Sequence, residues 1–270
     1  MRHTLFGVQI HDYSREEVLR KLRGWLGENR PRIIVTPNAE FVLAATKNPE
    51  FLERLNRADL AVADSVSLRY AIAALGPGLL INRYPGVDLL LTLAKLAADE
   101  QKNIMLIGGD PGAAEGARKR LRDTHANVSI SVHDPGKVVL NNHHVEISQG
   151  TLDEIERIKP DIIAVALGQQ KQEAFMEALK HQTSGVKIMI GVGGALDMIS
   201  GQRKRGPDWM QTAGLEWVWR ALIEPKRSNR IASASIIFPI MVAREAAKEQ
   251  DFIAACKRVL PEVLKQLKSK

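Results

Sequence analysis

Short apolar runs recur along the first 200 residues, and each leads through a polar or glycine-containing turn into a segment with helical periodicity. The runs cover residues 33–35, 60–63, 103–107, 128–132, 161–166 and 187–190. They are continuously apolar rather than alternating, which predicts strands that are covered on both faces. Strands that alternate with helices indicate an α/β fold with a mostly parallel sheet and a Rossmann-like, helix-covered core. Two Ser/Thr-x-x-Glu tetrads, at 14–17 and 151–154, predict helix starts.

The alternation stops near residues 200–206, where we expect a domain boundary. Residues 1–200 are predicted to form the α/β domain, and residues 201–270 an all-helical C-terminal appendage. Prolines at 225, 239 and 261 are expected to divide the appendage into separate helices, because proline removes a helical hydrogen bond and clashes with the preceding turn.

The net charge of +7 is concentrated in the appendage. Residues 202–270 contain 14 Lys and Arg against 7 Asp and Glu, so the excess equals that of the whole chain. A neutral body with a basic end favours a localised anionic partner, such as an anionic membrane surface. The single cysteine, Cys256, excludes an internal disulfide and suits a reducing compartment.

The N-terminus lacks the continuous apolar core of a signal peptide. The longest apolar stretch near the C-terminus, residues 231–243, is shorter than the roughly 20 residues that cross a bilayer. We therefore expect a cytoplasmic protein that at most lies on the membrane as a peripheral protein.

Polar residues and glycines gather where the predicted strands end, which is the ligand-binding edge of an open α/β sheet. They are Thr36, Asn38, Asp64, Gly108, Gly109, Gly168, Gln169, Gly191, Gly193 and Gly194. Glycines let the backbone approach phosphates near helix N-termini, although they also serve simply to turn the chain. Three such loops in one sheet favour a nucleotide site.

Each polar candidate also has a plain structural interpretation. Asp64 can be the general base of a transfer reaction or the N-cap of the next helix, and the residues alone favour the cap. Thr36 and Asn38 suit sugar hydroxyls or an acetamido group, but they also suit an ordinary turn. Arg83 and Gln172 can reach a ligand or lie in solvent, and solvation is the simpler interpretation of either residue alone.

No metal-binding motif is found: the seven histidines are scattered, and no Asp-x-Asp occurs to hold a divalent ion against a diphosphate. We therefore expect neither a metal nor another cofactor. Arginine side chains would then stabilise a leaving diphosphate, and Arg220, Arg227 and Arg230 are the candidates. Their alternative role is that of a solvated or lipid-facing basic surface.

Several motifs, taken in order, resemble those of the WecG/TagA/CpsF family of bacterial glycosyltransferases. They are Thr-Pro-Asn-Ala-Glu at 36–40, Ala-Asp-Ser at 63–65, Arg-Tyr-Pro-Gly-Val-Asp at 83–88, the glycines at 108–109, Val-Ala-Leu-Gly at 165–168, Lys-Gln-Glu at 171–173, Gly-Leu-Glu-Trp at 214–217 and Glu-Pro-Lys-Arg at 224–227. The resemblance covers nearly all of the first 230 residues. It implies inverting, metal-independent transfer of N-acetylmannosamine, or a related N-acetylhexosamine or its uronic acid, from UDP. The implied acceptor is N-acetylglucosamine on undecaprenyl diphosphate, in teichoic acid or other surface polysaccharide synthesis at the inner face of the cell membrane.

The resemblance also implies roles for individual residues and reverses the preference at one of them. Asp64 becomes the general base instead of a helix cap. Sugar contacts are implied for Thr36, Asn38, Arg83 and Gln172, and closure over the diphosphate for Arg220, Arg227 and Arg230. Two departures from the family pattern are Gln169-Gln170, in place of a small residue and proline, and the additional residues 231–270.

Two other functions remain open at this point. One is a transferase for a different UDP-sugar, such as UDP-glucose. The other is a non-catalytic nucleotide-binding module whose basic tail binds nucleic acid. The tryptophans lie in a helical apolar pattern rather than on an exposed stacking platform, which disfavours a nucleic-acid partner. The sequence leaves the oligomeric state undetermined and allows a homo-oligomer.

Overall fold

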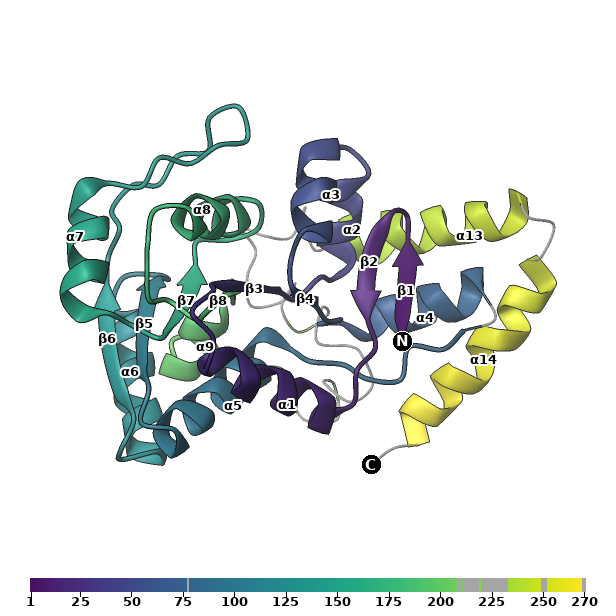
Figure 1. Ribbon diagram of the computed structural model, residues 1–270. Helices are drawn as coiled ribbons and strands as arrows, with labels where there is room; N and C mark the ends of the chain where they lie inside the picture. Colours follow the sequence, from purple (N-terminus) through teal and green to yellow (C-terminus); the bar gives the residue numbers. More distant parts are fainter. Residues whose placement is uncertain (77, 208–209, 211–218, 220–232, 249–251, 269–270) are drawn as a thin grey trace.

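A six-stranded parallel sheet forms the centre of the molecule in the computed structural model, which describes residues 1–76, 78–207, 210, 219, 233–248 and 252–268 (Figure 1). The strand order is β4-β3-β8-β7-β5-β6, and every neighbouring pair is parallel. The strands are β3 (Arg32–Val35), β4 (Leu60–Ala61), β5 (Asn103–Gly108), β6 (Ser129–His133), β7 (Ile162–Ala166) and β8 (Ile188–Gly191). The predicted mostly parallel α/β fold is confirmed.

Continuous apolar runs form these strands because both faces of the sheet are buried. In β5, Ile104 and Leu106 join one hydrophobic cluster, while Met105 and Ile107 join the cluster on the opposite face. This alternation follows from the two-residue repeat of a strand, which points successive side chains to opposite faces. Each strand therefore contributes to two cores, and the polar residues are left for the loops at its ends.

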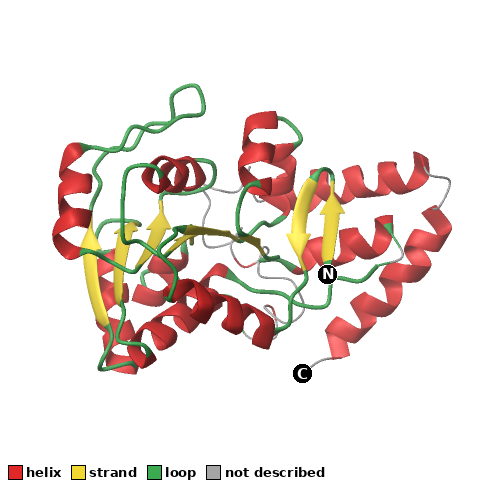
Figure 2. Cartoon of the chain, viewed as in Figure 1, coloured by secondary structure: helices red, strands yellow, loops and turns green. Residues whose placement is uncertain are grey.

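Helices cover both faces of the sheet (Figure 2). One core contains residues of α1 (Arg15–Leu26), α5 (Gly86–Asp99), α6 (Ala113–Thr124) and α9 (Ala195–Ser200). The other contains residues of α2 (Ala39–Ala45), α3 (Pro49–Asn56), α4 (Val66–Leu75), α7 (Gln149–Ile158) and α8 (Lys171–Lys180). The arrangement is a three-layer sandwich, with the sheet between two layers of helices.

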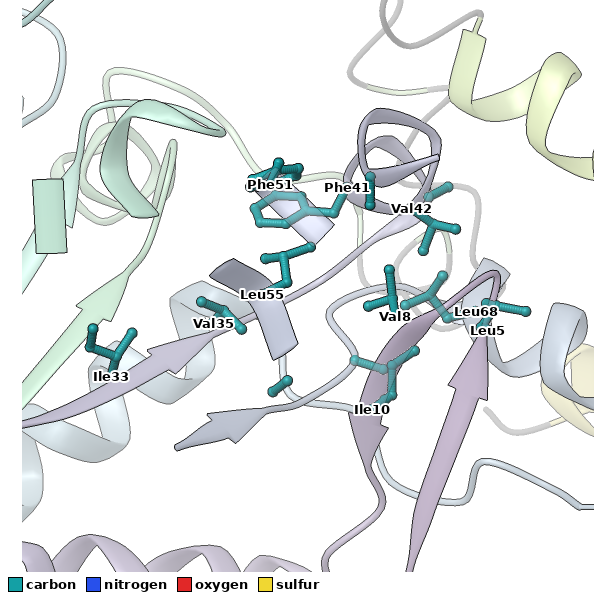
Figure 3. Packing of buried hydrophobic residues seen from close by; sticks show 14 of the residues in the cluster. Leu5, Val8, Ile10, Ile33, Val35, Phe41, Val42, Phe51, Leu55 and Leu68 are labelled. Atoms are coloured by element: carbon teal, nitrogen blue, oxygen red, sulfur yellow. The ribbon is translucent and has the colours of Figure 1, made fainter. Parts of the chain in front are cut away.

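A short antiparallel hairpin, β1 (Arg2–Leu5) and β2 (Val8–His11), lies beside the β4 edge of the sheet and was not predicted. Its buried side chains Leu5, Val8 and Ile10 pack toward helices α2 and α4 (Figure 3). The His11 Nδ1 accepts the backbone N–H of Ala61 at 3.0 Å, so the hairpin also binds an edge-strand donor. The hairpin thereby closes one end of the core.

Residues 201–207, the first of the predicted appendage, are not helical, whereas the described part of the C-terminal segment from residue 233 onward is helical, as expected. It consists of the π-helical turn η2 (Ser233–Ile237), α13 (Phe238–Lys248) and α14 (Phe252–Lys268). In Figure 1, α13 and α14 lie beside α4, away from the β6 edge of the sheet. Among the described residues, no helix combines the length and the apolar character that are needed to cross a bilayer.

The expected helix break at Pro261 is wrong, because α14 continues through it. Two polar contacts on either side of the proline attach α14 to α4. Arg258 donates to the carbonyl oxygens of Ala73 and Ala74 at 2.9 and 2.8 Å. Glu262 pairs with Arg69 at 2.6 Å. These contacts offset the cost of an interior proline, about 3 kcal/mol. Pro239 lies where the π-helical turn η2 passes directly into α13, so the expected separation into two helices at this proline is not found either, and Pro225 lies outside the described residues.

One predicted capping box is confirmed and the other is wrong. Ser14 and Glu17 form the expected reciprocal box at the start of α1. At the second site Ser148 is the cap of α7, and it accepts the N–H of Thr151. The Thr151 hydroxyl instead lies 2.9 Å from His133 Nε2, so a contact with β6 determines its role.

Candidate active site

A cleft of about 460 Å³ opens at the carboxyl ends of β4, β3, β8 and β7. Its size is within the range of small-molecule sites. The sequence-predicted residues that line it are Thr36, Asn38, Asp64, Arg83, Gly168, Gln169, Gln172, Gly193 and Gly194. Gly108, Gly109 and Gly191 are not among its lining residues, and Arg220, Arg227 and Arg230 lie outside the described residues. The cleft thus gathers side chains from loops far apart in the sequence.

Asp64 lies at the junction of β4 and α4, where it is held by a different helix. Ser65, not Asp64, occupies the N-cap position of α4. The Asp64 Oδ1 accepts the backbone N–H of Gly86, the first residue of α5, at 2.9 Å. The positive end of the α5 dipole favours a negative charge at this position. Asp64 is therefore a fixed carboxylate in the wall of the cleft.

Thr36 and Asn38 follow β3 and face the same cleft. A Cβ on Gly86 would lie 3.4 Å from the Thr36 Oγ1, so the hydroxyl is packed close to the residue that binds Asp64. The Asn38 Oδ1 accepts the Phe41 N–H at 3.1 Å and caps α2. Asn38 thus caps α2 through its Oδ1 and also lines the cleft. The side-chain NH₂, which the cap does not use, is the group that can bind a ligand.

Arg83 is positioned by the residues on either side of it. Asp12 accepts the backbone N–H groups of Ile81 and Asn82 at 3.0 and 2.9 Å, and the Asn82 side chain at 2.7 Å. Burial opposes the ionised form of Asp12, but these hydrogen bonds outweigh it and lower its pKa. The next residue, Tyr84, is buried. Within the described part of the chain, Arg83 has no ion-pair partner, so its guanidinium suits an anionic ligand.

Gln172 links α8 to the glycine loop after β8. It is buried, with 2% of its surface exposed. Its Oε1 accepts the Gly193 N–H at 3.0 Å, and its Nε2 donates to the Glu173 Oε1 at 2.7 Å. The Glu173 Oε2 accepts the Gln170 N–H at 2.6 Å. The Gly193 N–H is therefore engaged by Gln172, and the amide of Gln172 is turned by Glu173.

Glu173 is buried, and burial raises its pKa to about 7 although the hydrogen bonds from Gln172 and Gln170 lower it. Its two oxygens each face a donor, which is the pattern that a carboxylate satisfies. Gln170 has a φ of 70°, in the left-handed region, and makes the turn into α8. This is the loop in which Gln169-Gln170 departs from the family pattern.

The glycine loop after β5 is used for packing. Gly108 and Gly109 have φ values of 82° and 89°, and a Cβ on Gly108 would lie 2.9 Å from the Ala166 carbonyl oxygen. The buried Asp197 accepts the Asp110 N–H at 3.0 Å and fastens this loop to α9. The glycines thus allow close contact between two parts of the body.

The basic cluster at 203–205 contributes one side chain to the cleft. Arg205 lines it and donates from Nη1 to the Asp88 Oδ1 at 2.8 Å. Arg203 binds Asp110 and lies 3.6 Å from Asp197, away from the lining residues. Lys204 is exposed. Of the three, only Arg205 is therefore placed to contact a ligand in the cleft.

Several lining residues were not predicted as site residues. They are Glu40, Ser65, Ser67, Tyr70, Arg205, Ser235 and Pro239, among others. Ser67 and Tyr70 are three residues apart on α4, so helical periodicity after Asp64 was the available signal. Glu40 places a second carboxylate in the wall. Within the described ranges, no group of three or more His, Cys, Asp or Glu residues has the geometry of a metal site.

Comparison with known proteins gives one family and a set of close relatives. The model of the glycosyl transferase WecG/TagA/CpsF family matches residues 3–251, so the prediction that the family pattern ends near residue 230 is wrong, and only the residues after 251 lie beyond the match. A protein of Staphylococcus aureus strain MRSA252, named N-acetylglucosaminyldiphosphoundecaprenol N-acetyl-beta-D-mannosaminyltransferase, is 33% identical over 248 residues, 91% of this chain and 94% of its own length. Proteins of the same name from strains NCTC 8325 and COL are 32% identical over the same shares.

Proposed function

The chain belongs to the WecG/TagA/CpsF family of glycosyltransferases, and from this premise we propose that it transfers N-acetylmannosamine from UDP to N-acetylglucosamine carried on undecaprenyl diphosphate. The observation that carries the proposal is the cleft, in which Asp64 lies together with Thr36, Asn38, Arg83 and Gln172. The match in activity name among relatives that align over nearly the whole chain supports the choice of sugar and acceptor.

In the proposed mechanism Asp64 is the general base. It takes the proton of the acceptor hydroxyl as the hydroxyl oxygen forms a bond to the anomeric carbon of the donor. The bond from that carbon to the UDP oxygen breaks, and its electron pair leaves with UDP. The single displacement inverts the anomeric configuration. The Gly86 N–H, at 2.9 Å from Oδ1, fixes the direction of the carboxylate before the substrate arrives.

Cationic side chains take the charge that develops on the diphosphate. Arg83 and Arg205 lie in the walls of the cleft. We propose that Arg220, Arg227 and Arg230 complete this set when the substrates are bound. Positively charged donors that are aimed at the leaving group lower the barrier, since this electrostatic contribution is usually the largest in such reactions. The proposed mechanism uses neither a metal nor another cofactor. We therefore expect transfer to continue unchanged in excess chelator.

The lipid-linked acceptor places the reaction at a membrane surface. We propose that the chain acts as a peripheral protein on the inner face of the cell membrane, where its basic C-terminal segment faces anionic lipid. Co-sedimentation with vesicles of anionic and of zwitterionic lipids tests this, and equal binding to the two contradicts the charge-based part of the proposal.

The decisive experiment compares the two carboxylates of the cleft, Asp64 and Glu40. Transfer from UDP-N-acetylmannosamine to a lipid-diphosphate N-acetylglucosamine acceptor is measured for the unmodified chain, Asp64→Asn and Glu40→Gln. We expect Asp64→Asn to lower kcat by about 10²- to 10⁴-fold, the usual contribution of a general base, and Glu40→Gln to lower it less. Near-normal kcat in Asp64→Asn contradicts the mechanism. A parallel panel of UDP-sugars, including UDP-glucose, tests the donor.

A further inference from the structure

The cleft has two walls of different chemistry, and Asp64 lies where they meet. One wall comes from the sheet loops and includes Thr36, Gln172 and Gly193. The other wall comes from the start of α4 and from η2 and α13. In Figure 1, α4 and α13 lie beyond the β4 edge, on the side away from β7 and β5. A base that receives a proton from the acceptor must contact the acceptor. Asp64 directly precedes α4 in the sequence, so an acceptor that lies against the second wall can reach it.

Hydroxyl groups line the α4 part of this second wall. Ser65, Ser67 and Tyr70 all face the cleft, and the Ser65 and Ser67 Oγ atoms are 2.7 Å apart. Burial raises the pKa of the Tyr70 phenol, so that it stays protonated and can donate a hydrogen bond. Neutral hydroxyls next to the base suit the hydroxyl and acetamido groups of an uncharged sugar.

An exposed apolar row borders the same wall. Ala234, Ser235 and Pro239 of η2 and α13 line the cleft. The neighbouring Ile236, Ile237 and Ile240 are exposed to 59, 47 and 47% of their surface. Ile236 and Ile240 are four residues apart and share one face, about a quarter turn around the helical segment from the lining residues Ser235 and Pro239, and Ile237 lies one further step around it. An apolar surface that is continuous with a polar cleft suits an amphiphilic ligand.

We propose that α4 and the η2–α13 segment form the acceptor subsite, in which Ser65, Ser67 and Tyr70 bind the acceptor N-acetylglucosamine and Ile236, Ile237 and Ile240 bind the first isoprene units of its lipid. The inference rests on the proposed function. It commits the isoleucine row to the prenyl chain of the acceptor itself and not to the acyl chains of the bilayer. The lipid diphosphate lies between the two groups of residues, and the acceptor hydroxyl points to Asp64.

The first experiment separates the lipid chain from the sugar. The full chain with Ile236→Ser, Ile237→Ser and Ile240→Ser is assayed with a long-chain prenyl acceptor and with a water-soluble acceptor of short alkyl chain. We expect the KM for the long-chain acceptor to rise at least about tenfold, because three apolar contacts are lost. The kcat/KM for the short-chain acceptor and the KM for the UDP-sugar stay within about twofold.

A matched control uses apolar side chains on α14 that are at least as exposed and are not among the lining residues: Ile253→Ser, Leu260→Ser and Leu264→Ser. The control variant keeps the KM of the unmodified chain for both acceptors. An equal rise in the two variants, or a rise for the short acceptor as well, overturns the lipid assignment. So does a loss of binding to acceptor-free vesicles in the isoleucine variant that matches its loss of activity, because the row then binds the bilayer.

The second experiment tests the hydroxyl wall. Ser67→Ala and Tyr70→Phe are each expected to raise the KM for both acceptors by about threefold to tenfold, the usual effect of one lost hydrogen bond. The Kd of the UDP-sugar in the absence of acceptor stays unchanged. Tyr13→Phe removes a phenol hydroxyl outside the cleft lining and is the control. A rise in the Kd of the UDP-sugar that matches the loss of transfer places these residues in the donor site and overturns the inference.

The failure of the subsite and the failure of the proposed function give different results. If the unmodified chain transfers N-acetylmannosamine to neither acceptor, the proposed function fails. If it transfers to both acceptors, but the variants do not distinguish long from short chains or acceptor from donor, only the subsite fails. Thermal unfolding of each variant confirms that the comparison is between folded proteins.

Discussion

The two glycine loops at the carboxyl edge of the sheet look alike in sequence and serve different purposes. The loop after β8 contributes Gly193 and Gly194 to the cleft lining and is tied to Gln172. The loop after β5 contributes none of its glycines to that lining, and Asp197 fastens it to α9. The second loop uses its positive φ angles for packing, while the first uses its small residues to make room for a lining side chain. Glycine after a strand indicates a close approach, but not what approaches.

Among the substitutions that test this contrast between the loops, Gly191→Ala is expected to have the largest effect. A Cβ at this position would lie 2.7 Å from the Gln172 Nε2 and 3.0 Å from its Cδ, so Gln172 must move. Displacement of about 1 Å near the reacting groups commonly costs about 10²-fold in rate, and we expect kcat/KM to fall by that order. Steady-state kinetics with both substrates measure it. Wild-type kinetics in this variant remove the basis of the contrast between the loops.

A smaller effect is expected for Glu173→Gln. Whichever way the new amide turns, its NH₂ faces a donor, either the Gln170 N–H or the Gln172 Nε2. An unsatisfied buried donor costs about 1–3 kcal/mol, and the loosened Gln172 should lower kcat/KM by about tenfold. In Gln172→Ala the same substitution should have no further kinetic effect. Independent losses in the double variant exclude action through Gln172.

The pH dependence of stability provides a separate test of Glu173. Its pKa is raised to about 7 in the folded chain, against 4.5 as the ordinary value, so the folded state holds the proton more tightly. The free energy of unfolding therefore loses a contribution as pH rises from about 4.5 through 7. This pH-dependent loss should be absent from Glu173→Gln and retained in Glu115→Gln, an exposed position on α6. Denaturant titrations at several pH values between 5 and 8 measure the difference.

The loop after β5 should respond in stability and not in catalysis. Gly109→Ala forces a side chain into a backbone with φ of 89°, next to Ala113 at 3.3 Å. We expect a loss of about 1–2 kcal/mol in the free energy of unfolding. The values of kcat and KM for the folded fraction should stay within about twofold. Kinetic losses like those of Gly191→Ala indicate that this loop, too, reaches the substrate.

The smallest effect is expected at Gly24, in the last turn of α1. It is exposed, and a Cβ there meets nothing within 4 Å. Gly24→Ala should leave activity unchanged and raise the free energy of unfolding by up to about 1 kcal/mol, because alanine favours the helix. It is therefore the baseline for the two glycine substitutions above. A loss of activity here means that the assay is sensitive to general perturbation.

The parallel sheet could be predicted because each of its strands is buried on both faces and is therefore apolar throughout. The hairpin could not be predicted, because β1 and β2 have only four residues each. Their apolar side chains are buried by packing toward α2 and α4, which the local sequence does not show. The prediction of a helix break at Pro261 was wrong for the same reason. The local preference of proline favours a break, but contacts between α14 and α4 outweigh it. Short or locally disfavoured elements depend on partners that are distant in sequence.

For the site, the sequence indicated the loops but not the second function of each residue. Asn38 is both a helix cap and a lining residue. Asp64 accepts from Gly86, 22 positions away, and not from the helix that follows it. Ser235 and Pro239 reach the cleft from a segment nearly 200 residues after Thr36. The spacing of residues along the chain does not show which distant residues come into contact in the fold.

The attachment of α14 to α4 gives the molecule a division that natural selection can use. The family match ends at residue 251, and α14 begins at Phe252. Arg258 and Glu262 nonetheless hold the helix that follows Asp64. A gain, loss or exchange of this last helix can therefore alter how α4 is supported while the sheet loops, built into the core, keep their geometry. With the acceptor bound at α4, as proposed, changes in the last helix alter the preference for the acceptor, while binding of the UDP-sugar by the sheet loops is unchanged.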